Sequence, residues 1–180
     1  PPRMASPSLS ALAGFQQNVV VGVGDLAVSN NQAAALATYS LGSCIGVTIY
    51  DPVMRVGGLL HLMLPDSSLN PAKASQQPAM FADSGIPALF RAAYQMKADK
   101  YRVQICVAGG AQVMDSSGFF NIGKRNYESV TALLGKHGLR IQASQVGGMV
   151  SRTISLHIGT GEVRLKVSGC KDNIVLYNGA

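Results

Sequence analysis

A cysteine and a histidine lie on two neighbouring apolar segments, where together they could perform nucleophilic chemistry. Cys44 follows the Gly-Ser turn of "LGSCIGVTIYDP", and His61 lies in the next apolar run, "VGGLLHLML". A thiolate is a strong nucleophile, but a free cysteine with a pKa of about 8.5 is mostly protonated at neutral pH. An adjacent imidazole can accept that proton, and the resulting imidazolium stabilises the thiolate. The two residues are therefore a candidate nucleophile and base.

The spacing of these two residues predicts that they lie on the same face of a β-hairpin. The residues "DPVM" (51–54) are typical of a turn, because their proline fixes its φ near the value that a turn requires. With this loop, Tyr50 pairs with Arg55, and Cys44 lies directly opposite His61. Opposed side chains of an antiparallel pair have Cβ atoms about 4.5–5.5 Å apart. A loop of five residues would instead send the two side chains to opposite faces.

Residues just before the cysteine could complete a hydrolytic site. Gly42 permits a sharp bend, which leaves backbone N–H groups near Ser43 free to face an oxyanion. Thr38 and Ser40 are the nearest upstream hydroxyls that could orient the histidine. A lone cysteine and a lone histidine on apolar strands are more often core residues, so spacing alone leaves a purely structural role open.

The sequence shows neither a metal-binding nor a dinucleotide-binding pattern. Cys44, Cys106 and Cys170 are widely separated, and no HxxH motif or carboxylate cluster occurs. The pieces "GVGD" and "AGGA" lack the strand–glycine–helix context of a dinucleotide fingerprint. We therefore expect no metal and no cofactor. Three unpaired cysteines also argue against a disulfide framework and predict a reducing, cytoplasmic location, with Cys106 as a buried core thiol.

Composition predicts one globular domain. The 180 residues are 47% hydrophobic and 13% charged, and a chain of this length can bury a core. No apolar run approaches the roughly 18–20 residues of a membrane span, so we expect no membrane insertion. Residues 1–18 are rich in Pro, Ser and Ala and are expected to form a mobile tail. Residues 19–180 would then form a single domain.

The net charge of +6 is concentrated in the second half of the chain. Residues 91–180 carry twelve Lys/Arg against five Asp/Glu, whereas residues 1–90 carry three against four. A basic surface attracts nucleic acid or an acidic protein surface. The basic residues are dispersed and no aromatic-plus-basic motif accompanies them, so we expect no nucleic-acid partner.

The pattern of apolar residues predicts a mixed α/β (α+β) domain. Strands are expected over 19–24, 27–29, 33–40, 44–50, 56–64, 102–108, 140–146, 152–158 and 162–168, and helices over 80–98 and 121–138. The segment 65–79 is expected to be a loop, because Pro, Ser and Asn break regular structure. Many strands with two main helices are typical of a layered fold.

Several stretches of the sequence resemble the chemoreceptor glutamine deamidase family, CheD. They are "LGSCIGVTIYDP", "GGLLHLMLPDS", "FADSGIPAL", "AGGA", "NIGKRN" and the pattern GG…R…TG formed by Gly147, Gly148, Arg152, Thr160 and Gly161, in family order across residues 19–170. The resemblance implies hydrolysis of receptor glutamine side chains to glutamate and ammonia, without a cofactor. It assigns Cys44 as nucleophile, His61 as base and Thr38 as the third member of a triad. It also implies a layered sandwich of β-sheets flanked by helices, similar to the catalytic domain of cytotoxic necrotizing factor toxins.

The resemblance also implies protein partners. These are the cytoplasmic helices of chemoreceptors, as substrate, and a CheC-type phosphatase. Phe119 and Phe120 are consecutive apolar residues in a Gly/Ser setting and cannot easily both face a core, so one of them is a candidate substrate or partner contact. The alternative function is a non-enzymatic adaptor that binds and regulates CheC. A thiol-redox module is less favoured, because no resolving cysteine lies nearby. An intact set of Cys44, His61 and Thr38 favours an enzyme.

Overall fold

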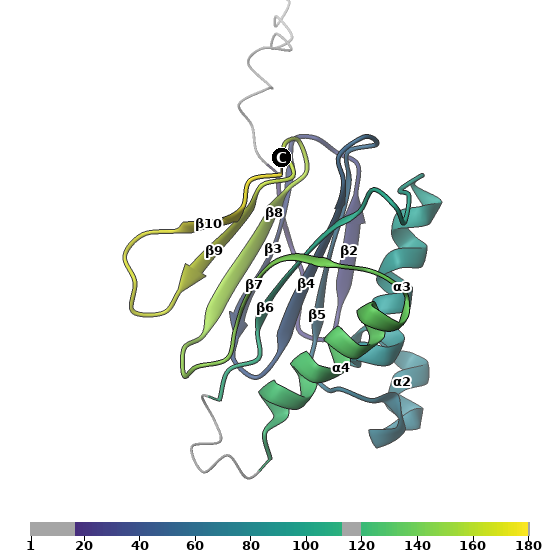
Figure 1. Cartoon of the computed structure of the whole chain (residues 1–180), viewed down its shortest axis with the longest axis vertical. Helices are drawn as coiled ribbons and strands as arrows, with labels where there is room; N and C mark the ends of the chain where they lie inside the picture. The colour runs from purple at the N-terminus through teal and green to yellow at the C-terminus, as the bar shows by residue number, and fades with distance from the viewer. Residues whose placement is uncertain (1–16, 113–119, 180) are drawn as a thin grey trace, which may run out of the picture.

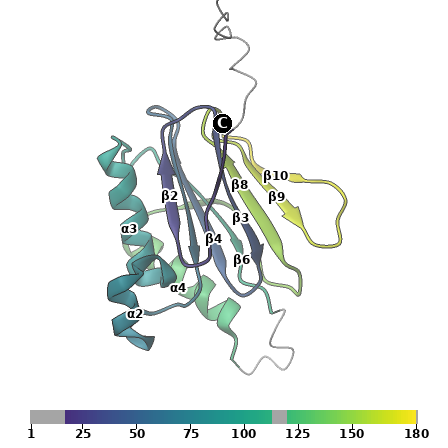
Figure 2. The ribbon, with the colours of Figure 1, turned by 180° about the vertical axis from the view of Figure 1, so that it is seen from behind.

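Two five-stranded β-sheets pack face to face, and the helices cover the outer side of one of them (Figures 1 and 2). The computed structural model describes residues 17–112 and 120–179. The β3 sheet has the strand order β1-β3-β8-β9-β10, and the β5 sheet has the order β2-β5-β4-β6-β7. The mixed α/β prediction is therefore confirmed.

The elements follow the predicted order with some differences in extent. The strands are β1 (Gln17–Val20), β2 (Leu26–Ser29), β3 (Ala34–Leu41), β4 (Ile45–Asp51), β5 (Val56–Leu62), β6 (Gln104–Gly109), β7 (Ile141–Val146), β8 (Arg152–His157), β9 (Val163–Val167) and β10 (Ile174–Tyr177). The helices are α2 (Pro71–Gln76), α3 (Ala82–Gln95) and α4 (Ile122–Lys136), with 3₁₀ turns at Ser67–Leu69 and Pro78–Met80. Among the helices in the described part of the chain, none has the length and apolar content that crossing a bilayer requires.

Three sequence predictions about elements are corrected. The segment 65–79 is not only a loop: α2 forms there because Asn70 accepts a hydrogen bond from the N–H of Lys73 and a proline occupies the first helical position. The first strand ends at Val20 rather than continuing to residue 24, where a glycine has a φ of +71°. The edge strand β10 was not predicted, and it pairs antiparallel with β9.

The β4–β5 hairpin differs from the prediction by two residues in register. Its last pair is Asp51–Val56, and His61 lies opposite Gly46 rather than opposite Cys44. The loop still has four residues but lies one position later than predicted, at 52–55, so β4 extends to Asp51 and β5 begins at Val56. The reason is that the Asp51 carboxylate accepts hydrogen bonds from the N–H groups of Val53 and Met54 in the turn. Because a shift of two preserves the alternation of side chains, Cys44 still precedes β4 on the face of His61.

Two apolar layers result from this arrangement. Alternate residues of β4, namely Ile45, Val47 and Ile49, face α3 and α4, in a core that also contains Leu89 and Val130. The other face of the β5 sheet packs against the β3 sheet. A Cβ placed on Gly46 would lie 3.0 Å from side chains of Leu41 and Ile154, so that face is closely covered. Cys106 is buried in this second layer, as predicted.

Candidate active site

His61 and Thr38 meet in the layer between the two sheets. His61 projects from β5 and Thr38 from β3, and each is only 1% exposed. Thr38 Oγ1 lies 2.6 Å from His61 Nδ1. Ser40, the other upstream hydroxyl, is exposed and lies with a φ of +58° where β3 bulges between its pairs with β8. The structure therefore brings Thr38, and not Ser40, to the histidine.

The partners of the Thr38 hydroxyl determine the tautomer of His61. Thr38 Oγ1 also lies 2.7 Å from the carbonyl oxygen of Val21, which can only accept a hydrogen bond. A hydroxyl has a single proton, and Thr38 donates it to Val21. The contact with His61 must then be a hydrogen bond that Nδ1–H donates to Thr38. The proton of the neutral imidazole is held on Nδ1, and Nε2 carries a free lone pair.

His61 Nε2 has the properties of a buried general base. It is shielded from solvent and has no hydrogen-bond partner among the described residues. Burial lowers the pKa of His61 to about 4, because an imidazolium would lose hydration in this apolar layer. The side chain is therefore neutral at pH 7, which leaves Nε2 able to accept a proton.

Cys44 lies at the edge of the same layer, in the turn between β3 and β4. It is half-buried, and it packs partly against the apolar residues between the sheets. Burial raises the pKa of its thiol, against a smaller opposing effect of its own backbone N–H. The thiolate–imidazolium pair that the sequence predicts is not favoured, because burial acts on both groups in favour of their neutral forms. His61 Nε2 has no hydrogen-bond partner among the described residues, so Cys44 does not hydrogen-bond to it in this structure.

The backbone of the nucleophile turn, residues 42–44, is held by its carbonyl groups. The carbonyl of Gly42 accepts from the N–H of Ala111, and that of Cys44 accepts from the N–H of Gly110, at 2.8 and 2.9 Å. In a trans peptide the C=O and N–H groups point in opposite directions. The N–H of Ser43, which shares a peptide with the Gly42 carbonyl, is thus directed away from Ala111, and the N–H of Cys44 is directed away from whatever holds the Ser43 carbonyl. They are the candidate oxyanion donors that the sequence placed near Gly42 and Ser43.

Two buried polar residues support this turn, and the sequence motifs that contain them had assigned no role to either. The side chain of Asn126, in α4, is 0% exposed and donates to the carbonyl of Ser43. Arg152, at 5% exposure, donates to the carbonyl of Gly109 in the segment that holds the turn. A usable signal existed for Asn126, because it lies four and eight residues before Val130 and Leu134 on the buried stripe of its helix.

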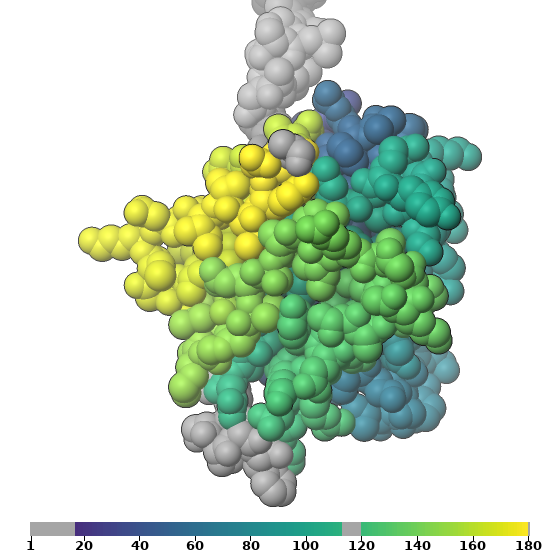
Figure 3. All heavy atoms as spheres, viewed as in Figure 1, coloured from purple at the N-terminus to yellow at the C-terminus, as the bar shows by residue number. Residues whose placement is uncertain are grey.

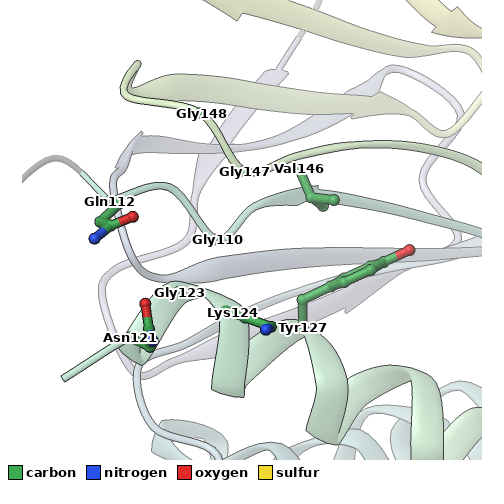
Figure 4. Close-up of a pocket in the computed structure, with 9 residues that line it drawn as sticks. All are labelled: Gly110, Gln112, Asn121, Gly123, Lys124, Tyr127, Val146, Gly147 and Gly148. Atoms are coloured by element: carbon green, nitrogen blue, oxygen red, sulfur yellow. The ribbon is translucent and has the colours of Figure 1, made fainter. Parts of the chain in front are cut away.

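A cavity of about 280 Å³ adjoins the turn, and Cys44 is not among its lining residues (Figure 4). Its lining residues are Gly110, Gln112, Asn121, Gly123, Lys124, Tyr127, Val146, Gly147 and Gly148. Gly110 connects the two places, since it lines the cavity and donates its N–H to the carbonyl of Cys44. Figure 4 shows Gln112 and Asn121 near one end of the cavity and Tyr127 extending along it.

The other sequence candidates lie as follows. Phe119 falls outside the described residues, and Phe120, two residues before α4, is 62% exposed. The two histidines that the sequence did not select lie elsewhere: His137 caps the C-terminus of α4, and His157 lies in β8. Across residues 17–112 and 120–179, no three His, Cys, Asp or Glu side chains form a group able to hold a metal ion.

Comparison with known proteins gives the family of this chain. The family model described as CheD chemotactic sensory transduction matches residues 63–167. The "Probable chemoreceptor glutamine deamidase CheD 1" of Syntrophus aciditrophicus (strain SB) is 48% identical over 152 residues, which cover 84% of this chain and 95% of that protein. The chain belongs to the CheD family. The resemblance noted in the sequence is thereby confirmed.

Other CheD proteins show the same breadth of similarity. The "Probable chemoreceptor glutamine deamidase CheD" of Solibacter usitatus (strain Ellin6076) is 44% identical over 159 residues, or 88% of this chain and 94% of that protein. A CheD protein of the same name from Pyrococcus abyssi (strain GE5 / Orsay) is 38% identical over 152 residues, or 83% of this chain and 91% of that protein. The similarity thus spans most of both chains.

Proposed function

We propose that this chain is a protein-glutamine deamidase that converts glutamine side chains of bacterial chemoreceptors to glutamate and releases ammonia. The observation that carries the proposal is the hydrogen bond from His61 Nδ1–H to Thr38, which leaves the lone pair on Nε2 in the layer against which Cys44 packs. The relatives named above as chemoreceptor glutamine deamidases supply the substrate class.

The reaction begins with attack of the Cys44 sulfur on the glutamine Cδ. The thiol proton passes to His61 Nε2 as the S–C bond forms, so no free thiolate has to accumulate. The carbonyl oxygen becomes an oxyanion, and the N–H groups of Ser43 and Cys44 donate to it. The imidazolium then returns its proton to the amide nitrogen, the C–N bond breaks, and ammonia leaves a thioester on Cys44.

Hydrolysis of the thioester restores the enzyme. Water adds to the thioester carbon while Nε2 removes one of its protons, and a second oxyanion forms on the same donors. When this intermediate collapses, the C–S bond breaks and the sulfur takes the proton back from His61. The products are the glutamate side chain and the free thiol, and the reaction consumes one water for each ammonia.

Thr38 suits this mechanism because it orients the imidazole without adding charge. A carboxylate in its place would favour the imidazolium before substrate binds. The hydroxyl instead accepts from Nδ1–H in an apolar layer where burial already disfavours the charged ring. His61 is charged only while it carries the proton of the nucleophile or of water.

The substrate and partner surface is proposed from charge and exposure. A chemoreceptor helix would approach the half-buried Cys44 in the cytoplasm, and the basic second half of the chain complements acidic side chains on such a helix. Phe120 is a candidate contact for the receptor or for a CheC-type phosphatase. We also propose that the two-sheet sandwich shares its fold with the catalytic domain of cytotoxic necrotizing factor toxins.

The test uses a purified chemoreceptor cytoplasmic fragment, with ammonia release and mass spectrometry of its glutamines as readouts. The parent protein should convert specific glutamines to glutamate. Cys44→Ala should abolish conversion, whereas Cys170→Ser, which changes the exposed cysteine, should retain activity within about twofold. Undiminished conversion by Cys44→Ala would refute the mechanism. Binding to CheC without any conversion by the parent would support the adaptor alternative.

A further inference from the structure

We propose that Asn126 is a positioning residue for the deamidation reaction, holding the nucleophile turn against the strand that carries His61. The inference rests on the proposed function, because it assigns Asn126 a part in presenting Cys44 to substrate. It concerns a side chain of α4, which lies on the outer side of the β5 sheet (Figure 1).

Asn126 links the segments that flank β4 and β5 at the end of the hairpin where the hydrogen bonds between these two strands stop. The β4–β5 pairing ends with Ile45 opposite Leu62. Its next position would set Cys44 opposite Met63. There the Asn126 side-chain nitrogen, Nδ2, donates to the carbonyl of Met63 and to that of Ser43, each at 2.9 Å. One amide group thus bridges the residue before the nucleophile and the residue two positions after the base.

The orientation of this amide follows from its partners. Both contacts are carbonyl oxygens, so the NH₂ group, with its two protons, must face them. The opposite orientation would place Oδ1 against two other oxygens. Oδ1 itself is buried and has no partner among the described residues. A buried acceptor without a partner costs free energy. The two hydrogen bonds that Nδ2 donates, which an apolar side chain could not make, offset this cost.

The bridge also sets the direction of a candidate oxyanion donor. The carbonyl of Ser43 and the N–H of Cys44 belong to one trans peptide and point in opposite directions. Because Asn126 holds that carbonyl, it directs the Cys44 N–H away from α4. Loss of the bridge would free this peptide to rotate, which would misplace both the oxyanion donor and the sulfur.

Close packing of α4 makes the reach of Asn126 possible. A Cβ on Gly123 would lie 2.5 Å from the carbonyl oxygens of Gly110 and Ala111, so the helix start rests on the segment that holds the turn. Farther along α4, Ser129 donates to the carbonyl of Pro65 at 2.8 Å. Ser129 therefore anchors the same helix to the chain after β5 without contacting the nucleophile turn, and it is a matched control.

The experiment compares Asn126→Ala with Ser129→Ala in a Cys170→Ser background, with folding checked by circular dichroism and thermal unfolding. Deamidation kcat and KM are measured, together with the rate of Cys44 alkylation by iodoacetamide. Asn126→Ala should lower kcat about 100-fold with KM changed less than threefold, because a small misplacement of reacting groups has effects of this size. Its alkylation rate should stay within about threefold of the parent, since alkylation needs no oxyanion donor.

Ser129→Ala should keep kcat within about twofold of the parent. If Asn126→Ala does not fold, Asn126→Ser retains one donor and should show a kcat between the parent and the hundredfold loss. A folded Asn126 variant with parental kcat would overturn the inference, and so would equal losses of activity in the Asn126 and Ser129 variants. A parent that releases no ammonia would overturn the proposed function, and this inference with it.

Discussion

Thr38 decides which nitrogen of His61 can act as a base. Its hydroxyl donates to the Val21 carbonyl and accepts from Nδ1–H, and this leaves the lone pair on Nε2. An exposed histidine would exchange between its tautomers and would titrate near neutral pH. In the buried layer between the two sheets, His61 is held in one tautomer and stays neutral at pH 7.

Replacing Thr38 by Val should reveal this role. Valine keeps the shape but leaves the Val21 carbonyl and His61 Nδ1–H buried without a partner, which costs about 1–3 kcal/mol for each group. We expect kcat for deamidation to fall about 100-fold or more, because the ring can then carry its proton on Nε2. Thr38→Ser retains the hydroxyl and should stay within about tenfold of the parent. Equal activities of the valine and serine variants would contradict the role.

The pH dependence of Cys44 reactivity should distinguish a neutral pair from a preformed ion pair. Burial raises the pKa of the Cys44 thiol and lowers that of His61 to about 4, so the thiolate fraction at pH 7 is small. Alkylation of Cys44 in Cys170→Ser should therefore rise about tenfold per pH unit from pH 6 to pH 8. A rate that is already high and constant between pH 5 and pH 8 would indicate a thiolate–imidazolium pair.

At the scale of elements, the β4–β5 hairpin explains why the candidate pair was predictable in part. Alternation of side chains along a strand has a period of two, so the common face of Cys44 and His61 followed from the loop length. The exact register did not follow, because it depends on the Asp51 carboxylate. That group accepts from turn N–H groups and pairs with Arg102 at 2.8 Å, a contact 51 residues away in sequence.

The packing of α4 can be tested with two glycines of the same helix. A Cβ at Gly123 would overlap two backbone carbonyl oxygens, whereas a Cβ at Gly135 would meet nothing within 4 Å. Gly123→Ala should lower the free energy of unfolding by about 2–3 kcal/mol, as overpacking does. Gly135→Ala should raise it by about 0.5–1 kcal/mol, because alanine favours the helix. Urea unfolding measures both, and a stable Gly123→Ala would show that α4 can move away from the turn.

The long-range hydrogen bonds of the candidate site could not be predicted from local sequence patterns. The role of Thr38 came from family resemblance, since its partner His61 lies 23 residues away on the other sheet. The two bonds of Asn126 span 83 and 63 residues. The periodicity of apolar residues and the residue types of turns predict single helices, strands and hairpins. The hydrogen bonds of Thr38 and Asn126 depend instead on how the two sheets stack and where α4 packs.

At the scale of the whole molecule, the site exists only because three layers meet. The β3 sheet supplies Thr38, the β5 sheet supplies His61, and α4 supplies Asn126 on the outer side. Most of the face in Figure 3 belongs to the second half of the chain, coloured green to yellow, which carries the excess of Lys and Arg. The molecule thus combines a buried base with a second half of the chain that carries a net positive charge, which in the proposed function would attract an acidic receptor helix.

The most direct test of the account is ¹⁵N NMR of the His61 ring in the folded protein, with His61→Gln used to assign its signals among the three histidines. We expect Nδ1 to carry the proton and Nε2 to be unprotonated at pH 7. The ring should stay neutral down to about pH 5, because burial lowers its pKa to about 4. An imidazolium at pH 7, or a neutral ring with its proton on Nε2, would contradict the account.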